Sequence, residues 1–398
     1  MRIVFCYKAL EKTGDGDDKF HGRTGHIEVR QPAENAAFHS FAEACRNVGV
    51  PFTADSNSDK QLGYSLLWNN VTKDWRRHSA FRAFVHPHLE RATLALETRA
   101  TVTRVLFDTD RRAVGVEGIG SDGNSWIARA NKEVILCAGA LKTPQLLMLS
   151  GIGDSEHLQS VGINPLLHLP GVGLHLRDHL ATPLMFAAKK ELPSTPEWST
   201  WQVLGPANLD WEGNGCADFQ IQWVVRRDFL PGFPKPLGYE DTDVIATVVA
   251  VLHPHGEGSV RLASADPAVA PVINPNYLGD DQDMVIWRTG FKLLRQLMAA
   301  PGMDEWVEAE IGDGPQGKKL EEYVRKNSIS QWHPVGTCRM SSRADFLSVV
   351  DDRCRVSGVN ALRVIDASVM PEHPSGNTQA PTMAIAEIAS NMVLEDNA

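Results

Sequence analysis

The chain has 398 residues, a length that suggests two or three domain-sized units and a large buried core. Its 43% hydrophobic and 22% charged residues are typical of a folded globular protein rather than a disordered one. The net charge of -10, without a cluster of basic residues, argues against nucleic acid as a partner. No apolar run approaches the roughly 20 residues needed to cross a bilayer, so we expect no membrane span.

The N-terminal residues lack the pattern of a signal peptide, because the first apolar run is short and charge follows at Lys8 and Glu11. Six scattered cysteines show neither CxxC spacing nor the density of a disulfide scaffold, which favours free thiols. Together these features predict a cytoplasmic protein. They indicate no oligomeric state.

The first half of the chain mixes strand and helix patterns. Residues 26–29 predict a short strand, and residues 33–48 have helical spacing that ends at Gly49. Alternating apolar residues predict three antiparallel strands at 94–98, 101–107 and 114–118. A continuous apolar run then predicts a buried parallel strand at 132–139, followed by a helix at 145–150.

The second half begins with a region of few motifs, residues 181–254, which is rich in tryptophan and which we expect to form a sheet. Its tryptophans are either core residues, the more common role, or the wall of a ligand site. Residues 280–298 predict an amphipathic helix, residues 362–366 a buried parallel strand, and Pro381 opens a further helix. The tryptophans of the 181–254 region are Trp198, Trp201, Trp211 and Trp223.

Three motifs near the C-terminus carry the strongest signal. They are HPVGTCRM at 333–340, RVIDASVMP at 363–371 and SGNTQAPTM at 375–383. In this fixed order they resemble the signature of the glucose–methanol–choline (GMC) oxidoreductases, especially the choline dehydrogenase-like and aryl-alcohol oxidase-like members. AGALKTPQLLMLSGIG at 138–153 is also similar to that family. The resemblance covers almost the whole chain.

The resemblance implies an α/β fold in which a FAD-binding, Rossmann-like domain is interleaved with an antiparallel-sheet substrate domain. It implies three parts: the remainder of the flavin-binding module at 1–180, the substrate-binding sheet and helices at 181–324, and a catalytic segment at 325–398 that returns to the flavin domain. It also implies FAD as cofactor and a small-molecule alcohol as substrate.

Particular residues follow from the same resemblance. Oxidation of an alcohol needs a base whose pKa lies near the working pH, and His is the natural choice. The resemblance makes His333 that base and Asn377 its partner in holding the substrate oxygen. A structural His in a turn and an Asn that caps a helix are the alternative interpretations. The flavin contacts implied are Val102, Asp366, Ala367, Asn377 and Thr378, and Asp366 is alternatively a loop stabiliser. No metal site is expected, because the other histidines lack ligand spacing such as HExxH.

One expected feature is missing from this sequence. The Gly-x-Gly-x-x-Gly fingerprint that brings backbone close to a dinucleotide pyrophosphate does not occur in it. In relatives that fingerprint precedes a segment similar to Tyr7–Glu11, so the resemblance implies an incomplete flavin module, from a truncated gene model. The alternatives are a flavin-free member of the family that acts as a lyase, a cyclase or a binding protein, and a non-functional remnant.

Overall fold

In the computed structural model the chain folds into two compact units, each assembled from segments far apart in the sequence. Unit 1 comprises residues 1–85, 179–255 and 280–331, and unit 2 comprises residues 86–178, 256–279 and 332–398. Trp198 lies outside the described residues. The described residues are 2–192, 200–212, 216–224, 238–239, 243–312, 318–342 and 344–398.

Unit 1 is built on an antiparallel sheet, as the sequence predicts for residues 181–254. The strands run in the order β16-β10-β13-β12-β11-β3, and β17 pairs with the far end of β10. Neighbouring strands are antiparallel throughout this described sheet. Its strands are β3 (Gly63–Leu66), β10 (Leu180–Ala188), β11 (Thr200–Gly205), β12 (Phe219–Val224), β13 (Val244–Val251), β16 (Val307–Glu310) and β17 (Ile329–Ser330).

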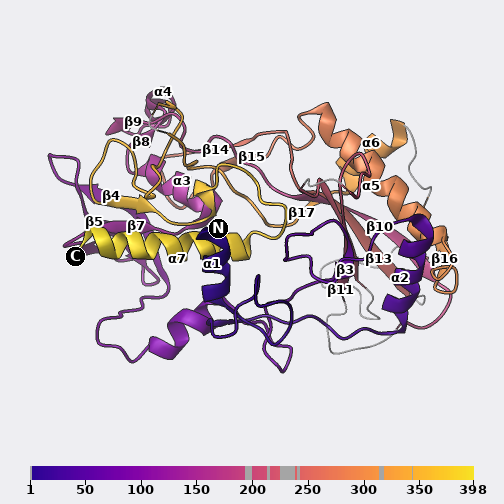
Figure 1. Ribbon diagram of the computed structural model, residues 1–398. Coiled ribbons are helices and arrows are strands. Elements are labelled where there is room, and N and C mark those ends of the chain that lie inside the picture. The colour runs from indigo at the N-terminus through magenta and orange to yellow at the C-terminus, as the bar shows by residue number, and fades with distance from the viewer. Residues whose placement is uncertain are drawn as a thin grey trace. The chain divides into compact units, whose positions relative to one another are not determined.

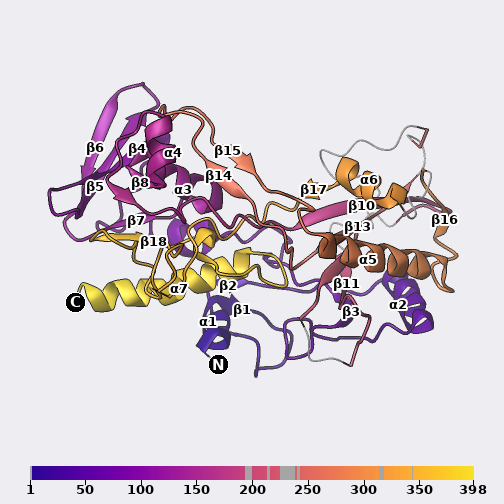
Figure 2. The same ribbon diagram turned by 90° about the horizontal axis from the view of Figure 1, so that it is seen from above.

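Helices α2 (Ala36–Val48) and α5 (Asp281–Ala299) lie side by side against this sheet (Figures 1 and 2). Helix α5 lies within one residue of its predicted bounds, whereas α2 begins three residues later than predicted and ends where predicted. Asn35 caps α2 by accepting a hydrogen bond from the backbone of Phe38, and Gly49 ends it with a left-handed φ of 84°. The side chain of Asp280 caps α5.

Aromatic side chains fill the space between these helices and the sheet. Trp201 and Trp223 are almost completely buried, with ring centroids 6.0 and 5.3 Å from that of Phe41. A Cβ on Gly290 of α5 would lie 2.6 Å from the Cγ1 of Val249, so a glycine allows α5 to approach β13 closely. These two tryptophans are therefore core residues, the more common of their two predicted roles.

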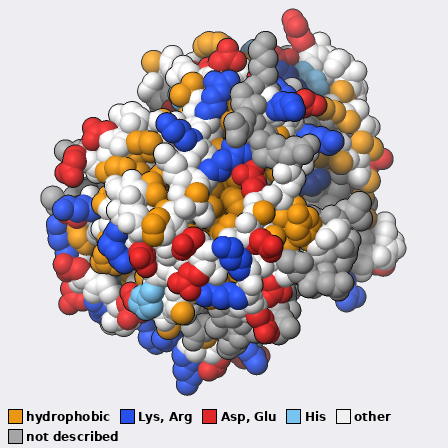
Figure 3. All heavy atoms as spheres, turned by 90° about the vertical axis from the view of Figure 1, so that its right-hand side faces the viewer, with side chains coloured by type: hydrophobic (Ala, Val, Ile, Leu, Met, Phe, Trp, Pro, Cys, Tyr) orange, Lys and Arg blue, Asp and Glu red, His pale blue; other side chains and the backbone are white. Residues whose placement is uncertain are grey.

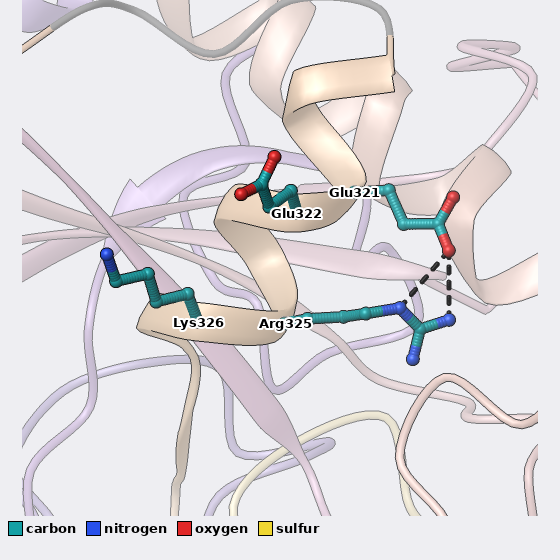
Figure 4. A pocket seen from close by; sticks show the side chains of 4 residues that line it. All are labelled: Glu321, Glu322, Arg325 and Lys326. Carbon is teal, nitrogen blue, oxygen red and sulfur yellow. Dashed lines mark hydrogen bonds and ion pairs between the residues drawn. The ribbon is translucent and has the colours of Figure 1, made fainter.

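Unit 1 also contains the helices α1 (Arg2–Leu10) and α6 (Lys318–Asn327). On α6 a shallow hollow is lined by Glu321, Glu322, Arg325 and Lys326, and Arg325 donates to Glu321 at 2.9 Å (Figure 4). Acidic and basic side chains are also interspersed over the face shown in Figure 3. Such alternation is typical of a solvated surface, and the hollow is lined by charged residues rather than by the hydrophobic and aromatic ones of most ligand sites.

Unit 2 contains an antiparallel sheet of three strands, β4 (Ala100–Phe107), β5 (Ala113–Gly120) and β6 (Ser125–Arg129). The first two were predicted at 101–107 and 114–118. The strand predicted at 94–98 is wrong, because Leu94–Thr98 is irregular and exposed, and the third strand is Ser125–Arg129 instead. That strand escapes a pattern search because its side chains are mostly exposed and do not alternate.

Two predicted parallel strands of unit 2 pair with each other. β7 (Val134–Leu136) lies parallel to β18 (Leu362–Val364), with Leu362 opposite Val134. The two strands are shorter than predicted, and within the described residues their sheet has no third strand. Leu136 and Val364 are buried in the core of the unit, whereas Ile135 is 40% exposed.

Helix α3 (Gly139–Leu149) begins six residues earlier than predicted. The expectation placed Pro144 before the helix, because a proline inside a helix leaves the carbonyl four residues earlier without its N–H partner. In the structure the hydroxyl of Thr337 donates to the carbonyl oxygen of Ala140 at 2.6 Å. A distant threonine thus satisfies the orphaned carbonyl, and the helix continues through the proline.

Helix α7 (Gln379–Asp396) closes the chain and begins two residues before the predicted start at Pro381. A proline is tolerated there because the first N–H groups of a helix have no intrahelical partner. The remaining short elements are β1 (Glu11–Lys12), β2 (Ile27–Glu28), β8 (Ile152–Gly153), β9 (Leu167–His168), β14 (Ser259–Arg261), β15 (Val272–Asn274), α4 (Ser155–Ser160), the π-helix η1 (Phe81–Val85) and the 3-10 helices η2 (His86–His88) and η3 (Ala367–Val369).

Candidate active site

His333 lies in a loop of unit 2 and is half-buried. Its backbone N–H donates to Oδ1 of Asp178 at 2.9 Å. The other carboxylate oxygen of Asp178 accepts a hydrogen bond from the hydroxyl of Tyr277 at 2.6 Å. Asp178 is only 6% exposed. The loop that carries His333 is therefore anchored by a buried carboxylate, which is itself held from its other side.

A second histidine fixes the same loop. His373 is buried, and its Nε2 lies 3.0 Å from the backbone oxygen of His333. A carbonyl oxygen only accepts hydrogen bonds, so Nε2 of His373 carries a proton and donates it to this bond. Beside it, Arg177 forms an ion pair with Glu372. The segment after Pro371 is thus connected to the His333 loop by a hydrogen bond.

Burial lowers the pKa of His333 below its ordinary value of 6.5, while the negative charge of Asp178 raises it. Burial is the larger effect. The imidazole is consequently neutral at neutral pH, the form that accepts a proton.

The motif at 363–371 meets the motif at 333–340 in unit 2. The backbone N–H of Cys338 donates to the carbonyl of Ser368 at 2.8 Å, and that of Gly336 to the carbonyl of Ala367 at 3.3 Å. Gly336 has a φ of 88°, and a Cβ there would lie 2.4 Å from the backbone oxygen of His175. Only glycine fits this turn without strain.

Asp366 lies two residues after β18, at the N-cap of η3, and its carboxylate is already engaged. One oxygen accepts from the backbone of Gly139 at 2.9 Å and from the hydroxyl of Thr143 at 2.6 Å, and the other accepts from the backbone of Ser368 at 2.8 Å. These bonds hold the start of α3 and the turn η3 against the strand end. Ala367 is the first residue of that turn. The contacts of Asp366 are those of a loop stabiliser.

Asn377 and Thr378 precede helix α7. Asn377 is exposed, and the N-cap of the helix is Thr378, whose side chain makes no capping hydrogen bond. The alternative interpretation of Asn377 as the helix cap is therefore wrong, because the helix begins one residue too late for it. The positive end of the α7 dipole therefore lies at Gln379, directly after Asn377 and Thr378.

Val102, the remaining predicted contact, lies on β4, which packs against α3. It is half-buried and opposite Gly118 of β5. Among the described residues, no group of three or more His, Cys, Asp or Glu is placed to hold a metal ion. No helix among the residues that the structure describes is long and apolar enough to cross a membrane.

The sequence motifs did not identify Asp178, Tyr277 and His373 as parts of this site. Asp178 and His333 are 155 positions apart, and Tyr277 and Asp178 are 99 positions apart. No local pattern reports a contact over such distances. The one available signal for Asp178 was an acidic residue beside a histidine in the stretch LRDH.

Comparison with known proteins gives two family matches, both described as GMC oxidoreductase. One model covers residues 6–181 and the other covers residues 254–386. The oxygen-dependent choline dehydrogenase 1 of Chromohalobacter salexigens is 33% identical over 415 residues, which cover 99% of this chain and 74% of that protein. The mitochondrial choline dehydrogenase of Homo sapiens is 37% identical and covers 95% of this chain and 67% of that protein.

Comparison with solved structures gives matches to two oxidases. The crystal structure of pyridoxine 4-oxidase from Mesorbium loti matches with a TM-score of 0.89 at 27% identity, over 99% of this chain and 77% of that one. Formate oxidase of Aspergillus oryzae RIB40 matches with a TM-score of 0.87 at 23% identity, over 99% of this chain and 78% of that one, a likeness of fold.

Proposed function

The chain belongs to the glucose–methanol–choline family of FAD-dependent oxidoreductases that act on alcohols, and we propose that His333 is the base of its reaction. The observation that carries this proposal is the state of His333. Its imidazole is half-buried and neutral, and its backbone is fixed on both sides, by Asp178 through the N–H and by His373 through the carbonyl.

We further propose that the predicted contact residues of unit 2 hold a flavin. The N-terminus of α7 is the positive end of the helix dipole, which suits the electron-rich edge of an isoalloxazine ring. We assign Asn377 and Thr378 to that edge, and Ala367 and Val102 to other contacts with the cofactor. Asp366 contributes indirectly, because its carboxylate holds Gly139 and Ser368 in place. When bound, FAD supplies the acceptor for the hydride that leaves the alcohol carbon.

The protein's own part in the reaction is to position the alcohol and remove its proton. The neutral imidazole of His333 takes the hydroxyl proton as the carbonyl double bond forms. The side chain of Asn377 donates a hydrogen bond to the substrate oxygen while negative charge develops there. The alcohol leaves as an aldehyde or ketone, having lost one proton to His333 and one hydride.

We assign substrate recognition to the 181–324 region, whose antiparallel sheet forms the framework of unit 1. Relatives with the names choline dehydrogenase and pyridoxine 4-oxidase act on small molecules that carry a hydroxyl group. We therefore propose a small-molecule alcohol as substrate for this chain.

The test is His333→Ala in the flavin-containing enzyme, with a panel of small alcohols. We expect kcat/KM to fall by more than about 100-fold, since general-base catalysis contributes roughly 10²–10⁴-fold. Flavin content, measured by absorbance, should stay unchanged. The exposed His39, replaced by Ala, serves as the control. If His333 only braced its turn, the variant would lose stability and flavin together while turnover per flavin survived.

A further inference from the structure

We propose that Asp178, held in place by Tyr277, is a positioning residue that fixes the His333 loop and keeps its imidazole basic enough to accept a proton. The inference rests on the proposed role of His333 as the base. It adds a carboxylate and a phenol that no sequence motif assigned to the reaction, and it says how they act.

The geometry of Asp178 is that of a buried bridge. One of its carboxylate oxygens is 2.9 Å from the backbone nitrogen of His333, and the other is 2.6 Å from the hydroxyl of Tyr277. Asp178 comes from the loop before β10, and Tyr277 from the loop after β15. The carboxylate thus holds three segments of unit 2 together. A charge so close to the loop also acts on the imidazole, because a nearby negative charge favours the protonated ring.

Other charged or titratable groups also lie near this loop. His373 donates to the carbonyl of His333. Arg177, which precedes Asp178, directs its guanidinium to Glu257 at 2.7 Å and to Glu372. The charge of Arg177 is therefore shared between two other carboxylates, so Asp178 is the acidic group joined directly to the His333 backbone.

Two substitutions should shift the basicity of His333 in opposite directions. Asp178→Asn keeps an oxygen that accepts from His333 but removes the negative charge, so the ring should lose its proton at lower pH. Tyr277→Phe removes a hydrogen bond that stabilises the carboxylate charge, so the charge acts more strongly and the ring should hold its proton to higher pH. If Asp178 and Tyr277 only brace the loop, both variants should lose stability, and the basicity of His333 should not shift in opposite directions.

The experiment measures the reaction of His333 with diethyl pyrocarbonate, which modifies only the neutral imidazole, as a function of pH. Peptide mass spectrometry of the purified full chain follows that one site, so the readout does not depend on turnover. The midpoint should fall by about one pH unit in Asp178→Asn, a typical lower value for a neighbouring opposite charge. It should rise in Tyr277→Phe. The kcat/KM profile of the flavin-containing enzyme should shift in the same directions.

Unit 1 offers matched controls. Asp283 is equally buried and accepts from the backbone of His255 at 2.9 Å, and the hydroxyl of Tyr323 donates to the carbonyl of Pro183 at 3.0 Å. Asp283→Asn and Tyr323→Phe should leave the His333 midpoint at the wild-type value. A wild-type midpoint in Asp178→Asn, or equal downward shifts in both test variants, overturns the inference. Full turnover in His333→Ala overturns the proposed function instead, so the two failures are distinguishable.

Discussion

Two histidines of this molecule contact carboxylates in different ways. His21 of unit 1 is buried, and both of its ring nitrogens face acids: Nδ1 lies 3.0 Å from Glu11 and Nε2 lies 2.8 Å from Asp55. His333 of unit 2 meets its carboxylate through the backbone N–H. An acid bonded to the ring fixes a proton on that ring, whereas an acid bonded to the backbone leaves the ring nitrogens to other partners.

The two pKa values move in opposite directions as a result. Hydrogen bonds to Asp55 and then Glu11 raise the pKa of His21 from 6.5 to about 9, although burial acts against them. Burial lowers the pKa of His333, and the charge of Asp178 offsets this only in part. At neutral pH, His21 is therefore a cation that joins two segments of unit 1, and His333 is a neutral base. Burial alone therefore does not separate a structural histidine from the base that we propose.

The contrast between His21 and His333 is tested most directly by removing the His21 cation. We expect His21→Gln to lower the free energy of unfolding by about 3 kcal/mol, because two carboxylates are left near each other without their charged partner. Turnover per flavin should stay at the wild-type value. Urea unfolding and kinetics on the same preparation measure both quantities, with the exposed His39→Gln as control. A loss of turnover per flavin without loss of stability would reverse the assigned roles.

The pH dependence of stability should also identify His21. Its folded pKa lies above the unfolded value of 6.5, so the stabilisation is complete below about pH 6.5 and is lost as the pH rises through about 9. Melting temperatures measured from neutral pH to about pH 10 should fall more steeply in the wild type than in His21→Gln. Parallel curves for the two proteins would mean that His21 is not the titrating group.

Asn377→Ala tests the proposed reaction site, to which His333 belongs. We expect kcat per flavin to fall about tenfold, the equivalent of one hydrogen bond to a developing charge, and so by less than in His333→Ala. Melting temperature should not change, because Asn377 is exposed and does not cap α7. Asn391→Ala, on the exposed surface of α7, is the matched control. An equal loss of turnover in both asparagine variants would argue against a role for Asn377 in the reaction.

Sequence motifs predict His333 and Asn377 as reacting residues, and hydrophobic patterns located α2, α5 and the strands β7 and β18, but not the pairing of these two strands. Local signals suffice for these, since the caps Asn35 and Asp280 lie next to the helices that they begin. Partners distant in sequence were not predictable in this way. The start of α3 depends on the bond from Thr337 to Ala140, 197 positions away, and the anchoring of His333 depends on Asp178. Such contacts exist only once the chain has folded.

The smallest expected effect concerns Trp68, which supports His21 from the side. The rings of Trp68 and His21 are stacked with centroids 4.6 Å apart, and the indole N–H donates to Asp55 at 3.2 Å. Trp68→Phe keeps an aromatic face for the imidazolium and loses one hydrogen bond, so unfolding should cost about 1 kcal/mol less. Trp68→Leu should lose more, because the cation also loses its aromatic partner.

Neither Trp68 variant should abolish the loss of stability at alkaline pH, because Glu11 and Asp55 still hold the proton on His21. Urea unfolding at neutral pH and at about pH 10 measures both effects together. If Trp68→Phe removed this alkaline loss as completely as His21→Gln, the proton would be held by the indole contact rather than by the carboxylates. The contrast between the two histidines would then rest on their aromatic surroundings and not on where their acids bind.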